Sequence, residues 1–277
     1  MTINEALSEG RTAFTEHHLE TPFLDACLLL AHTLGRTKEY ILASGPDPVD
    51  EKSLVTFRSL VARRLENIPV SYLRGVKEFY GREFLVDPRV LVPRPDTETL
   101  VETVLSLLHA RPEPRTVHDL CTGSGCIALT LKLENPYLQV SASDISPEAG
   151  EVFRENCRRL GVSVPFILSD LLSSVPGTFD IITANPPYLT DEEYAAMAAA
   201  GWPEPRVALA GGLEGLDIFM RLIEKSVASL APKGYLVCEA APGQFEALGK
   251  AMEKAHFSSV EVTRDLAGRE RVIIGQV

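Results

Sequence analysis

The sequence predicts an α/β protein in which a helical amino-terminal region precedes a mainly parallel sheet. Residues 1–75 carry helix-capping signals and an apolar stripe at helical spacing, and no strand pattern competes there. Residues 76–92 are rich in strand signals broken by turn residues. From residue 93 onward, strand patterns alternate with helical segments, which is typical of right-handed crossovers and a parallel sheet. We therefore expect a helical domain over 1–75, a connector over 76–92 and an α/β domain over 93–277.

The amino-terminal helices are predicted from their start signals and one apolar stripe. Thr2 with Glu5 three residues later matches a capping box, and Thr21 followed by Pro22 marks a second helix start. The stripe consists of Leu54, Phe57, Val61 and Leu65.

The connector and the domain after it are predicted from short apolar runs. Strand-like runs at 78–86 and 90–92 form the connector, and a helical stretch from Asp96 to Leu108 follows it. Strand signals then occur at 117–120, 139–143, 165–168, 179–184, 235–238, 260–263 and 272–274. Ligands of such a sheet bind at the carboxyl ends of its strands, so residues that follow the strands are candidate site residues.

Composition excludes several classes of protein. The chain has 277 residues, 45% hydrophobic and 23% charged, with a net charge of -11, which excludes a disordered or collagen-like chain. No run reaches the roughly 18 apolar residues of a membrane span. The five cysteines are odd in number and lack metal-binding spacing, so we expect a reducing, cytoplasmic setting and no metal site. Residues 76–277 carry 19 basic and 28 acidic side chains, so we expect no stable direct binding to nucleic acid.

A glycine-rich turn follows the strand signal at 117–120. The turn, Asp119-Leu120-Cys121-Thr122-Gly123-Ser124-Gly125, leads into a helix, whose free amide groups and small residues suit a nucleotide. Asp144 ends the next strand, where it can accept ribose hydroxyls, and Asp170 follows the third, where it can accept from an adenine amine. Tight packing of the turn and a capping role for Asp144 are the structural alternatives.

The spacing of the turn distinguishes between two kinds of nucleotide. A dinucleotide site requires glycine at the first, third and sixth positions, where this chain has Cys121, Gly123 and Cys126. The Asp-x-Gly-x-Gly-x-Gly pattern of S-adenosylmethionine methyltransferases fits better, with Asp119, Gly123 and Gly125 in register and Cys121 in place of the first glycine.

Asn185-Pro186-Pro187-Tyr188 directly follows the strand signal at 179–184, on the same sheet edge as the glycine turn. The prolines remove two donors and leave the Asn185 side-chain oxygen and the Pro186 carbonyl as acceptors for a planar NH₂ group. This arrangement suits methyl transfer to an amide or aryl amine, because two acceptors orient a weakly nucleophilic nitrogen without a charged base. Tyr188 is expected to stack on the planar group. A proline-rich turn alone would not explain Asn185 and Tyr188.

These motifs resemble the HemK family of protein-(glutamine) methyltransferases that act on class 1 peptide chain release factors. The resemblance includes Phe79-Tyr80-Gly81, Val92 to Glu98, the glycine turn, Asp144, Asn185 to Tyr188, and Pro205 to Leu216. It implies an amino-terminal helical bundle that docks the substrate, a β-hairpin connector and a Rossmann-like, seven-stranded class I methyltransferase domain. It also implies S-adenosylmethionine as cofactor and the glutamine of the Gly-Gly-Gln loop as methyl acceptor.

The resemblance assigns a role to each site residue. The cofactor-binding residues are Asp119, Cys121, Thr122, Gly123, Ser124, Gly125, Asp144, Asp170, Leu171 and Asn185. The residues that bind the glutamine amide and act in catalysis are Asn185, Pro186, Pro187 and Tyr188. Glu239 is interpreted as structural, and Arg94 and Glu98 as braces of the joint between domains.

Two other functions stay open from the sequence. One is methylation of the exocyclic amine of adenine in DNA or RNA, which the same tetrapeptide would serve and which the net charge disfavours. The other is a module that binds the nucleotide without catalysis, which the intact Asn185 to Tyr188 run disfavours.

Overall fold

A computed structural model describes residues 1–109 and 115–277 of the chain. The described residues divide into two compact units, Met1–Val76 with Ala198–Pro203 and Lys77–Met197 with Glu204–Val277. Within the described part of the chain, no helix combines the length and the apolar character needed to cross a membrane.

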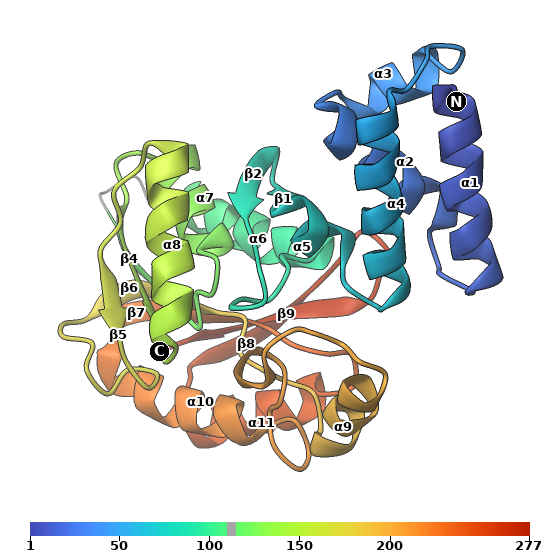
Figure 1. The fold of residues 1–277 in the computed structure, drawn as a ribbon. Helices are drawn as coiled ribbons and strands as arrows, with labels where there is room; N and C mark the ends of the chain where they lie inside the picture. The colour runs from blue at the N-terminus through green and yellow to red at the C-terminus, as the bar shows by residue number, and fades with distance from the viewer. Residues whose placement is uncertain (110–114) are drawn as a thin grey trace. The chain divides into compact units, whose positions relative to one another are not determined.

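The first unit is helical, as expected. Its helices are α1 (Ile3–Glu16), α2 (Pro22–Leu34), α3 (Lys38–Ala43), α4 (Glu51–Leu65) and α5 (Val70–Arg74) (Figure 1). The capping box is confirmed, because the Thr2 hydroxyl accepts from the Glu5 amide and the Glu5 carboxylate accepts from the Thr2 amide. Phe57 of the α4 stripe is fully buried in one cluster with Phe14 and Leu30, so this unit has a hydrophobic core of its own.

The expected cap at Thr21 is wrong, although α2 does begin at Pro22. The Thr21 hydroxyl donates to the Asp25 carboxylate at 2.7 Å and accepts no backbone hydrogen bond. The ψ of Thr21 is 54°, outside the extended conformation that aligns a capping hydroxyl with the helix amides. The other oxygen of the buried Asp25 accepts from Arg64 Nε at 2.8 Å, so Thr21 helps to hold a buried ion pair.

A hairpin of β1 (Val76–Phe79) and β2 (Arg82–Leu85) forms the start of the connector. Both turn residues, Tyr80 and Gly81, have positive φ, 51° and 71°, as a two-residue type I′ turn requires. The strand predicted at 90–92 is wrong, because this run is irregular and the Val92 amide donates to Glu204 Oε1 at 2.8 Å. The Val90 amide donates to Asp87 O at 3.1 Å, so two of the three amides in the run already have partners outside any strand ladder.

The second unit contains a seven-stranded sheet in the order β5-β4-β3-β6-β7-β9-β8. The strands are β3 (Thr116–Leu120), β4 (Gln139–Asp144), β5 (Phe166–Leu168), β6 (Phe179–Ala184), β7 (Leu230–Glu239), β8 (Ser259–Arg264) and β9 (Glu270–Gln276). Strands β3 to β7 pair in parallel, and β9 runs antiparallel to both β7 and β8. Each predicted strand signal overlaps one of these strands, and the expected Rossmann-like α/β fold is confirmed.

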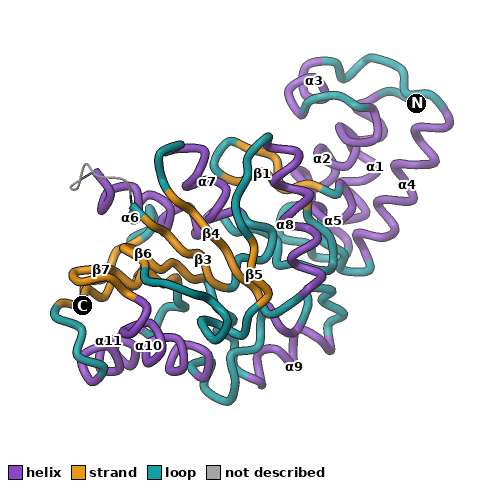
Figure 2. The backbone as a smooth tube through the Cα atoms, turned by 90° about the vertical axis from the view of Figure 1, so that its left-hand side faces the viewer, coloured by secondary structure: helices purple, strands orange, loops and turns teal. Residues whose placement is uncertain are grey.

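Helices cover both faces of the sheet (Figure 2). The 3₁₀ turn η1 (Pro95–Thr97) leads into α6 (Glu98–His109), which packs with α7 (Cys126–Glu134) and α8 (Pro147–Leu160) on one face. The opposite face is covered by α10 (Asp217–Ser229) and α11 (Phe245–Lys254).

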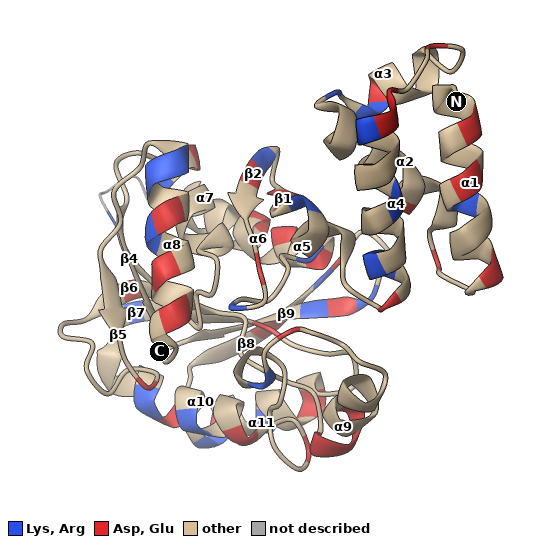
Figure 3. Cartoon of the chain, in the orientation of Figure 1, with Lys and Arg blue, Asp and Glu red and all other residues tan. Residues whose placement is uncertain are grey.

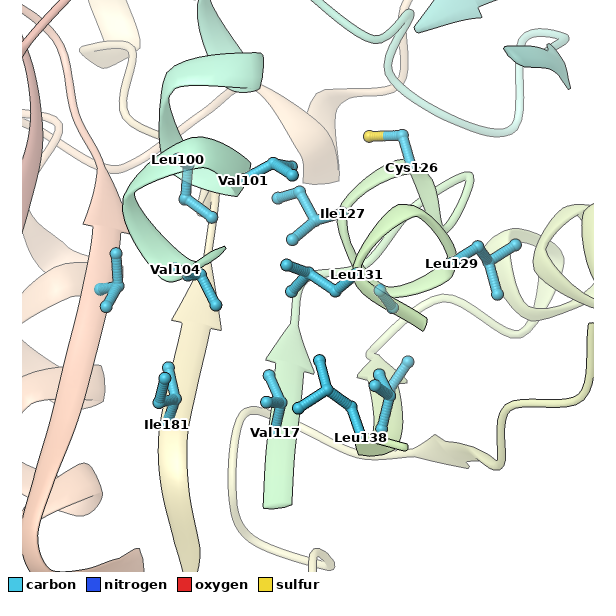
Figure 4. Close-up of a cluster of buried hydrophobic side chains, with 14 of the residues drawn as sticks. Leu100, Val101, Val104, Val117, Cys126, Ile127, Leu129, Leu131, Leu138 and Ile181 are labelled. Carbon is cyan, nitrogen blue, oxygen red and sulfur yellow. The ribbon is translucent and has the colours of Figure 1, made fainter. Parts of the chain in front are cut away.

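The side chains of the central strands alternate between two cores. Figure 4 shows Val104 of α6 and Leu131 of α7 above Val117 and Ile181 of the strands. Ile182, the next residue along β6, points to the other face and joins the cluster under α10. The chain runs from β3 outward to β4 and β5 and then returns to β6 on the other side of β3, so the strand order reverses there. In open α/β sheets, such a reversal places the binding crevice at the carboxyl ends of the two strands.

Candidate active site

A cavity of about 610 Å³ lies at the carboxyl ends of neighbouring parallel strands. Predicted site residues that line it are Cys121 and Gly123 after β3, Asp144 at the end of β4, Asp170 and Leu171 after β5, and Asn185 and Pro187 after β6. All of these residues belong to the second unit. The fold therefore brings the glycine turn, both carboxylates and the tetrapeptide to one cavity, at the sheet edge where the sequence places them.

The described residues that line the cavity do not include Asp119, Thr122, Ser124, Gly125, Pro186 and Tyr188. Asp119 is fully buried, and its carboxylate accepts from the Thr122 hydroxyl at 2.6 Å and the Thr183 hydroxyl at 2.7 Å. Burial raises the pKa of Asp119 to about 7. Asp119 thus joins the glycine turn to β6 from behind the cavity wall, and its direct contact with a cofactor stays a prediction.

The glycine turn requires left-handed backbone at three positions. The φ angles of Cys121, Gly123 and Gly125 are 54°, 53° and 84°. A Cβ at Gly123 would meet open space, whereas a Cβ at Gly125 would lie 2.6 Å from the Phe153 ring. The absence of a side chain at Gly123 therefore leaves room in the cavity, and the absence of one at Gly125 allows α7 to approach α8.

Asp144 connects the glycine turn to the next helix. Its Oδ2 accepts from the Gly123 amide at 2.9 Å, and its Oδ1 accepts from the amide of Ser146, the N-cap of α8, at 3.0 Å. Burial raises the pKa of Asp144. Each carboxylate oxygen can accept a further hydrogen bond, so the two amides orient Asp144 while leaving it able to accept from two hydroxyls.

Asp170 is paired with a cation. Its Oδ2 accepts from Arg221 Nη2 on α10, and both side chains are 44% exposed. Leu171, which follows, is buried and has a φ of 50°. The left-handed turn at Leu171 redirects the chain after β5, and both Asp170 and Leu171 line the cavity.

The tetrapeptide presents one unpaired acceptor. Asn185 Nδ2 donates to Thr97 Oγ1 at 3.3 Å, and the buried Asn185 Oδ1 has no partner among the described residues. Burial raises the pKa of Tyr188 to about 12, so its phenol stays neutral. A buried acceptor without a partner is costly, and it is expected where a ligand supplies the missing donor.

A glycine allows the loop after the tetrapeptide to return close to the tetrapeptide backbone. The segment runs through α9 (Asp191–Ala199) and the 3₁₀ turn η2 (Arg206–Ala208), and it returns so that the Leu189 amide donates to Leu209 O and the Gly211 amide to Leu189 O. A Cβ at Gly211 would lie 2.6 Å from the Pro187 carbonyl. In the sequence, Gly211 is distinguished only by the family resemblance, because no local pattern indicates its close approach to the tetrapeptide.

Sequence reasoning also missed residues from distant loops. Leu91 and Arg206 line the cavity, and Thr97 contacts Asn185 across 88 positions of the chain. Arg94 pairs with Glu204 and Glu98 accepts from the Tyr80 amide, and both contacts lie within the second unit, so a role for Arg94 and Glu98 at the joint between domains stays a prediction. No motif spacing connects loops that meet only in the folded chain.

Two family models match the chain. Residues 5–75 match the PrmC N-terminal domain, and residues 96–201 match the methyltransferase small domain. A methyltransferase from Pyrococcus furiosus has a similar fold, with a TM-score of 0.53 and 19% identity over 78% of this chain and 96% of that one.

Curated relatives match the chain over nearly its full length. The release factor glutamine methyltransferase of Bordetella pertussis is 39% identical over 253 residues, which cover 91% of this chain and 93% of the relative. The protein of the same name from Koribacter versatilis is 36% identical and covers 100% of this chain and 99% of the relative. With this fold and this cavity, the chain belongs to the release factor glutamine methyltransferase family.

Proposed function

We propose that this protein transfers a methyl group from S-adenosylmethionine to the side-chain amide nitrogen of the glutamine in the Gly-Gly-Gln loop of class 1 peptide chain release factors. The observation that carries the proposal is the buried Oδ1 of Asn185, a residue that lines the cavity, because this acceptor has no N–H donor among the described residues. The names of the curated relatives support the choice of acceptor protein. Such a substrate would place the enzyme in the cytoplasm.

The residues around the cavity fit the proposed cofactor. A volume of about 610 Å³ is within the range of small-molecule sites. Asp144 has acceptor capacity for two ribose hydroxyls, and Gly123 leaves space where a side chain would protrude. When bound, S-adenosylmethionine would supply an electrophilic methyl group on a sulfonium. Asp170 and Leu171, which line the cavity, would contact the adenine region, and Asp119 would act by holding the turn.

The tetrapeptide would hold and orient the amide. Asn185 Oδ1 and the Pro186 carbonyl would each accept one hydrogen of the planar NH₂ group, which aims the nitrogen at the methyl carbon. As the new N–CH₃ bond forms and the S–CH₃ bond breaks, positive charge on the nitrogen strengthens both hydrogen bonds. One N–H proton then leaves to solvent. Tyr188, which is neutral, would pack on the planar group and exclude water.

The charge distribution of the second unit does not favour a nucleic-acid substrate. Lys and Arg are interspersed with Asp and Glu along α8 and α10 (Figure 3). On α8, for example, both Arg158 and Arg159 pair with Glu155, at 2.7 Å and 3.3 Å. Binding to a phosphate backbone needs clustered Lys and Arg that neutralise phosphates and so release the counterions condensed on the nucleic acid.

The test is transfer of a labelled methyl group from S-adenosylmethionine to a purified class 1 release factor. Three parallel reactions contain the same factor with its Gly-Gly-Gln glutamine replaced, duplex DNA, and RNA. Label on the intact factor alone supports the proposal. Label on the substituted factor would assign a different acceptor, and label on nucleic acid would favour adenine methylation. Absence of label from all four reactions would contradict an activity on these substrates.

A further inference from the structure

A buried carboxylate lies beside the tetrapeptide without a partner of its own. Glu239, the last residue of β7, is 1% exposed, and among the described residues no donor meets either of its oxygens at full hydrogen-bond geometry. Burial raises the pKa of Glu239 to about 7, while the neighbouring Thr97 and Asn185 side chains lower it. The Thr97 and Asn185 side chains therefore lie close enough to the Glu239 carboxyl group to stabilise its charge. An unpartnered buried carboxyl group is destabilising, so its presence calls for an explanation.

The Thr97 hydroxyl, which neighbours both Glu239 and Asn185, can donate a single hydrogen bond. Thr97 Oγ1 is buried and accepts from Asn185 Nδ2 at 3.3 Å. A threonine hydroxyl can accept two hydrogen bonds but donates only one. The direction of that single O–H bond therefore decides which end of the Asn185 amide Thr97 can face.

Two orientations of the Asn185 amide are available, and they present opposite groups to the cavity. If Thr97 donates to Asn185, the oxygen faces Thr97 and the NH₂ group faces the cavity, where it would oppose the NH₂ group of a substrate amide. If Thr97 donates elsewhere, it can only accept from Asn185, and Oδ1 faces the cavity. An ionised carboxylate only accepts, so it can take the Thr97 hydrogen and leave the second orientation alone.

We propose that Glu239 is a positioning residue for amide methylation, whose carboxylate accepts the Thr97 hydroxyl hydrogen and thereby fixes Asn185 with Oδ1 toward the substrate. The inference rests on the proposed function and assigns a role to a carboxylate that the sequence presented as structural. The proposed role does not require Glu239 to contact the substrate.

Other charged groups around Glu239 set its protonation. Arg271 on β9 lowers its pKa, and Asp96 of η1, which pairs with Arg271 at 2.8 Å, raises it. Glu239 in turn raises the pKa of Tyr188 and of Cys126 on α7. A protonated Glu239 can itself donate to Thr97, which frees the Thr97 hydrogen for Asn185. The kcat should therefore fall as the pH decreases through about 7.

The first test separates the Thr97 hydroxyl from its bulk. Thr97→Val keeps the shape and removes the hydroxyl, and it is expected to lower kcat about tenfold to hundredfold, as loss of a hydrogen-bond partner that orients a site residue does. The KM for release factor and the Kd for S-adenosylmethionine should stay near the wild-type values. Thr97→Ser should restore most of the loss. Thr103→Val, which removes a buried hydroxyl on α6 that bonds to Thr99 O, is the matched control and should leave kcat unchanged.

The second test asks whether Glu239 acts through Thr97. Glu239→Leu should lower kcat by an amount similar to Thr97→Val, and the double variant should lose no more than the larger single loss, because both remove one hydrogen-bonded chain. Additive losses, or a wild-type kcat in Thr97→Val, would overturn the inference.

The conservative Glu239→Gln variant provides a test that does not depend on whether the protein folds with leucine at position 239. It keeps an acceptor oxygen and does not titrate, so its kcat should lack the decrease between pH 8 and pH 6 that the wild type shows. Asp119, whose pKa is also about 7, is the same in both proteins and cancels from the comparison. Identical pH profiles would contradict the inference. An inactive wild-type enzyme would instead contradict the proposed function.

Discussion

Cys121 shows how one residue departs from a motif without departing from its geometry. It occupies the first glycine position of the S-adenosylmethionine pattern and adopts a φ of 54°, which costs a non-glycine residue roughly 1–2 kcal/mol. Its side chain offsets part of this cost by packing against the core under α10. We expect Cys121→Gly to leave the Kd for S-adenosylmethionine within about threefold and the free energy of unfolding within about 1 kcal/mol. Calorimetry and denaturant titration measure the two quantities, and a large loss of affinity would mean that the thiol itself contacts the ligand.

Asn185 is expected to affect the reaction far more than binding. Asn185→Ala removes the acceptor that strengthens as the N–CH₃ bond forms, so kcat should decrease by an amount equivalent to roughly 2–4 kcal/mol. Removing the unpartnered Oδ1 relieves a desolvation penalty, which offsets the loss of the hydrogen bond from Asn185 Nδ2 to Thr97, so stability should hardly change. Single-turnover methyl transfer and a cofactor titration on the same sample test this. Wild-type turnover in Asn185→Ala would refute the assigned role.

Glu239 should also leave a signature in the pH dependence of stability. Its pKa in the folded protein, about 7, lies above its ordinary value of 4.5. Its favourable contribution is therefore complete below pH 4.5 and is lost as the pH rises through 7, by up to about 3 kcal/mol. Glu239→Gln removes this dependence, so the difference in unfolding free energy between variant and wild type should grow in favour of the variant from pH 5 to pH 8. His118 and Asp119 titrate in overlapping ranges but are common to both proteins. A difference that is constant with pH would exclude the raised pKa.

At the scale of structural elements, the two glycines of the turn between β3 and α7 have different roles. Gly125 sits where α7 meets α8, and Gly123 faces the cavity. Both have positive φ, so backbone strain is similar at the two positions. The difference between them lies in what surrounds the missing side chain.

Alanine at each position is expected to separate these tasks. Gly125→Ala forces the Phe153 ring to move and should lower the free energy of unfolding by about 2–5 kcal/mol, the sum of overpacking and strain. Gly123→Ala has open space and should cost only about 1 kcal/mol in stability while weakening cofactor binding more. Thermal unfolding and cofactor titration of the pair distinguish the tasks, and equal effects on both quantities would contradict the assignment.

At the scale of the whole molecule, each unit has a core of its own. Phe14, Phe57 and Leu30 pack in the helical unit, and clusters on both faces of the sheet form the core of the second unit. The cavity is lined by the second unit alone among the described residues. Cofactor binding should therefore stabilise that unit directly.

Calorimetric unfolding is expected to resolve this difference. S-adenosylmethionine at about a hundred times its Kd should stabilise the second unit by about 2.7 kcal/mol and raise its Tm by roughly 5–10 °C. The transition of the helical unit should stay in place. A single transition that shifts as a whole would show that the two units unfold cooperatively.

The sequence alone determined the α/β class, the order of the seven strands along the chain and the location of the tetrapeptide at the ligand edge. Such features follow from local patterns: period-two apolar runs, capping residues and the rule that parallel strands share a carboxyl edge. Thr2 and Glu5 are an example, since a capping box depends on four consecutive residues and forms as predicted. Thr21 and the run at 90–92 failed because side chains distant in sequence, Arg64 and Glu204, helped to determine the local hydrogen bonds.

Only the tertiary structure decided which polar groups meet inside the site. Thr97, Asn185 and Glu239 come from three segments that no spacing rule connects, and their orientation depends on the donors and acceptors of one another. In the folded chain, Asp119 also accepts hydrogen bonds from two threonines, and Asp170 pairs with Arg221. A motif records the residue types that chemistry requires, whereas burial and hydrogen-bond partners, which set pKa and orientation, exist only once the chain has folded.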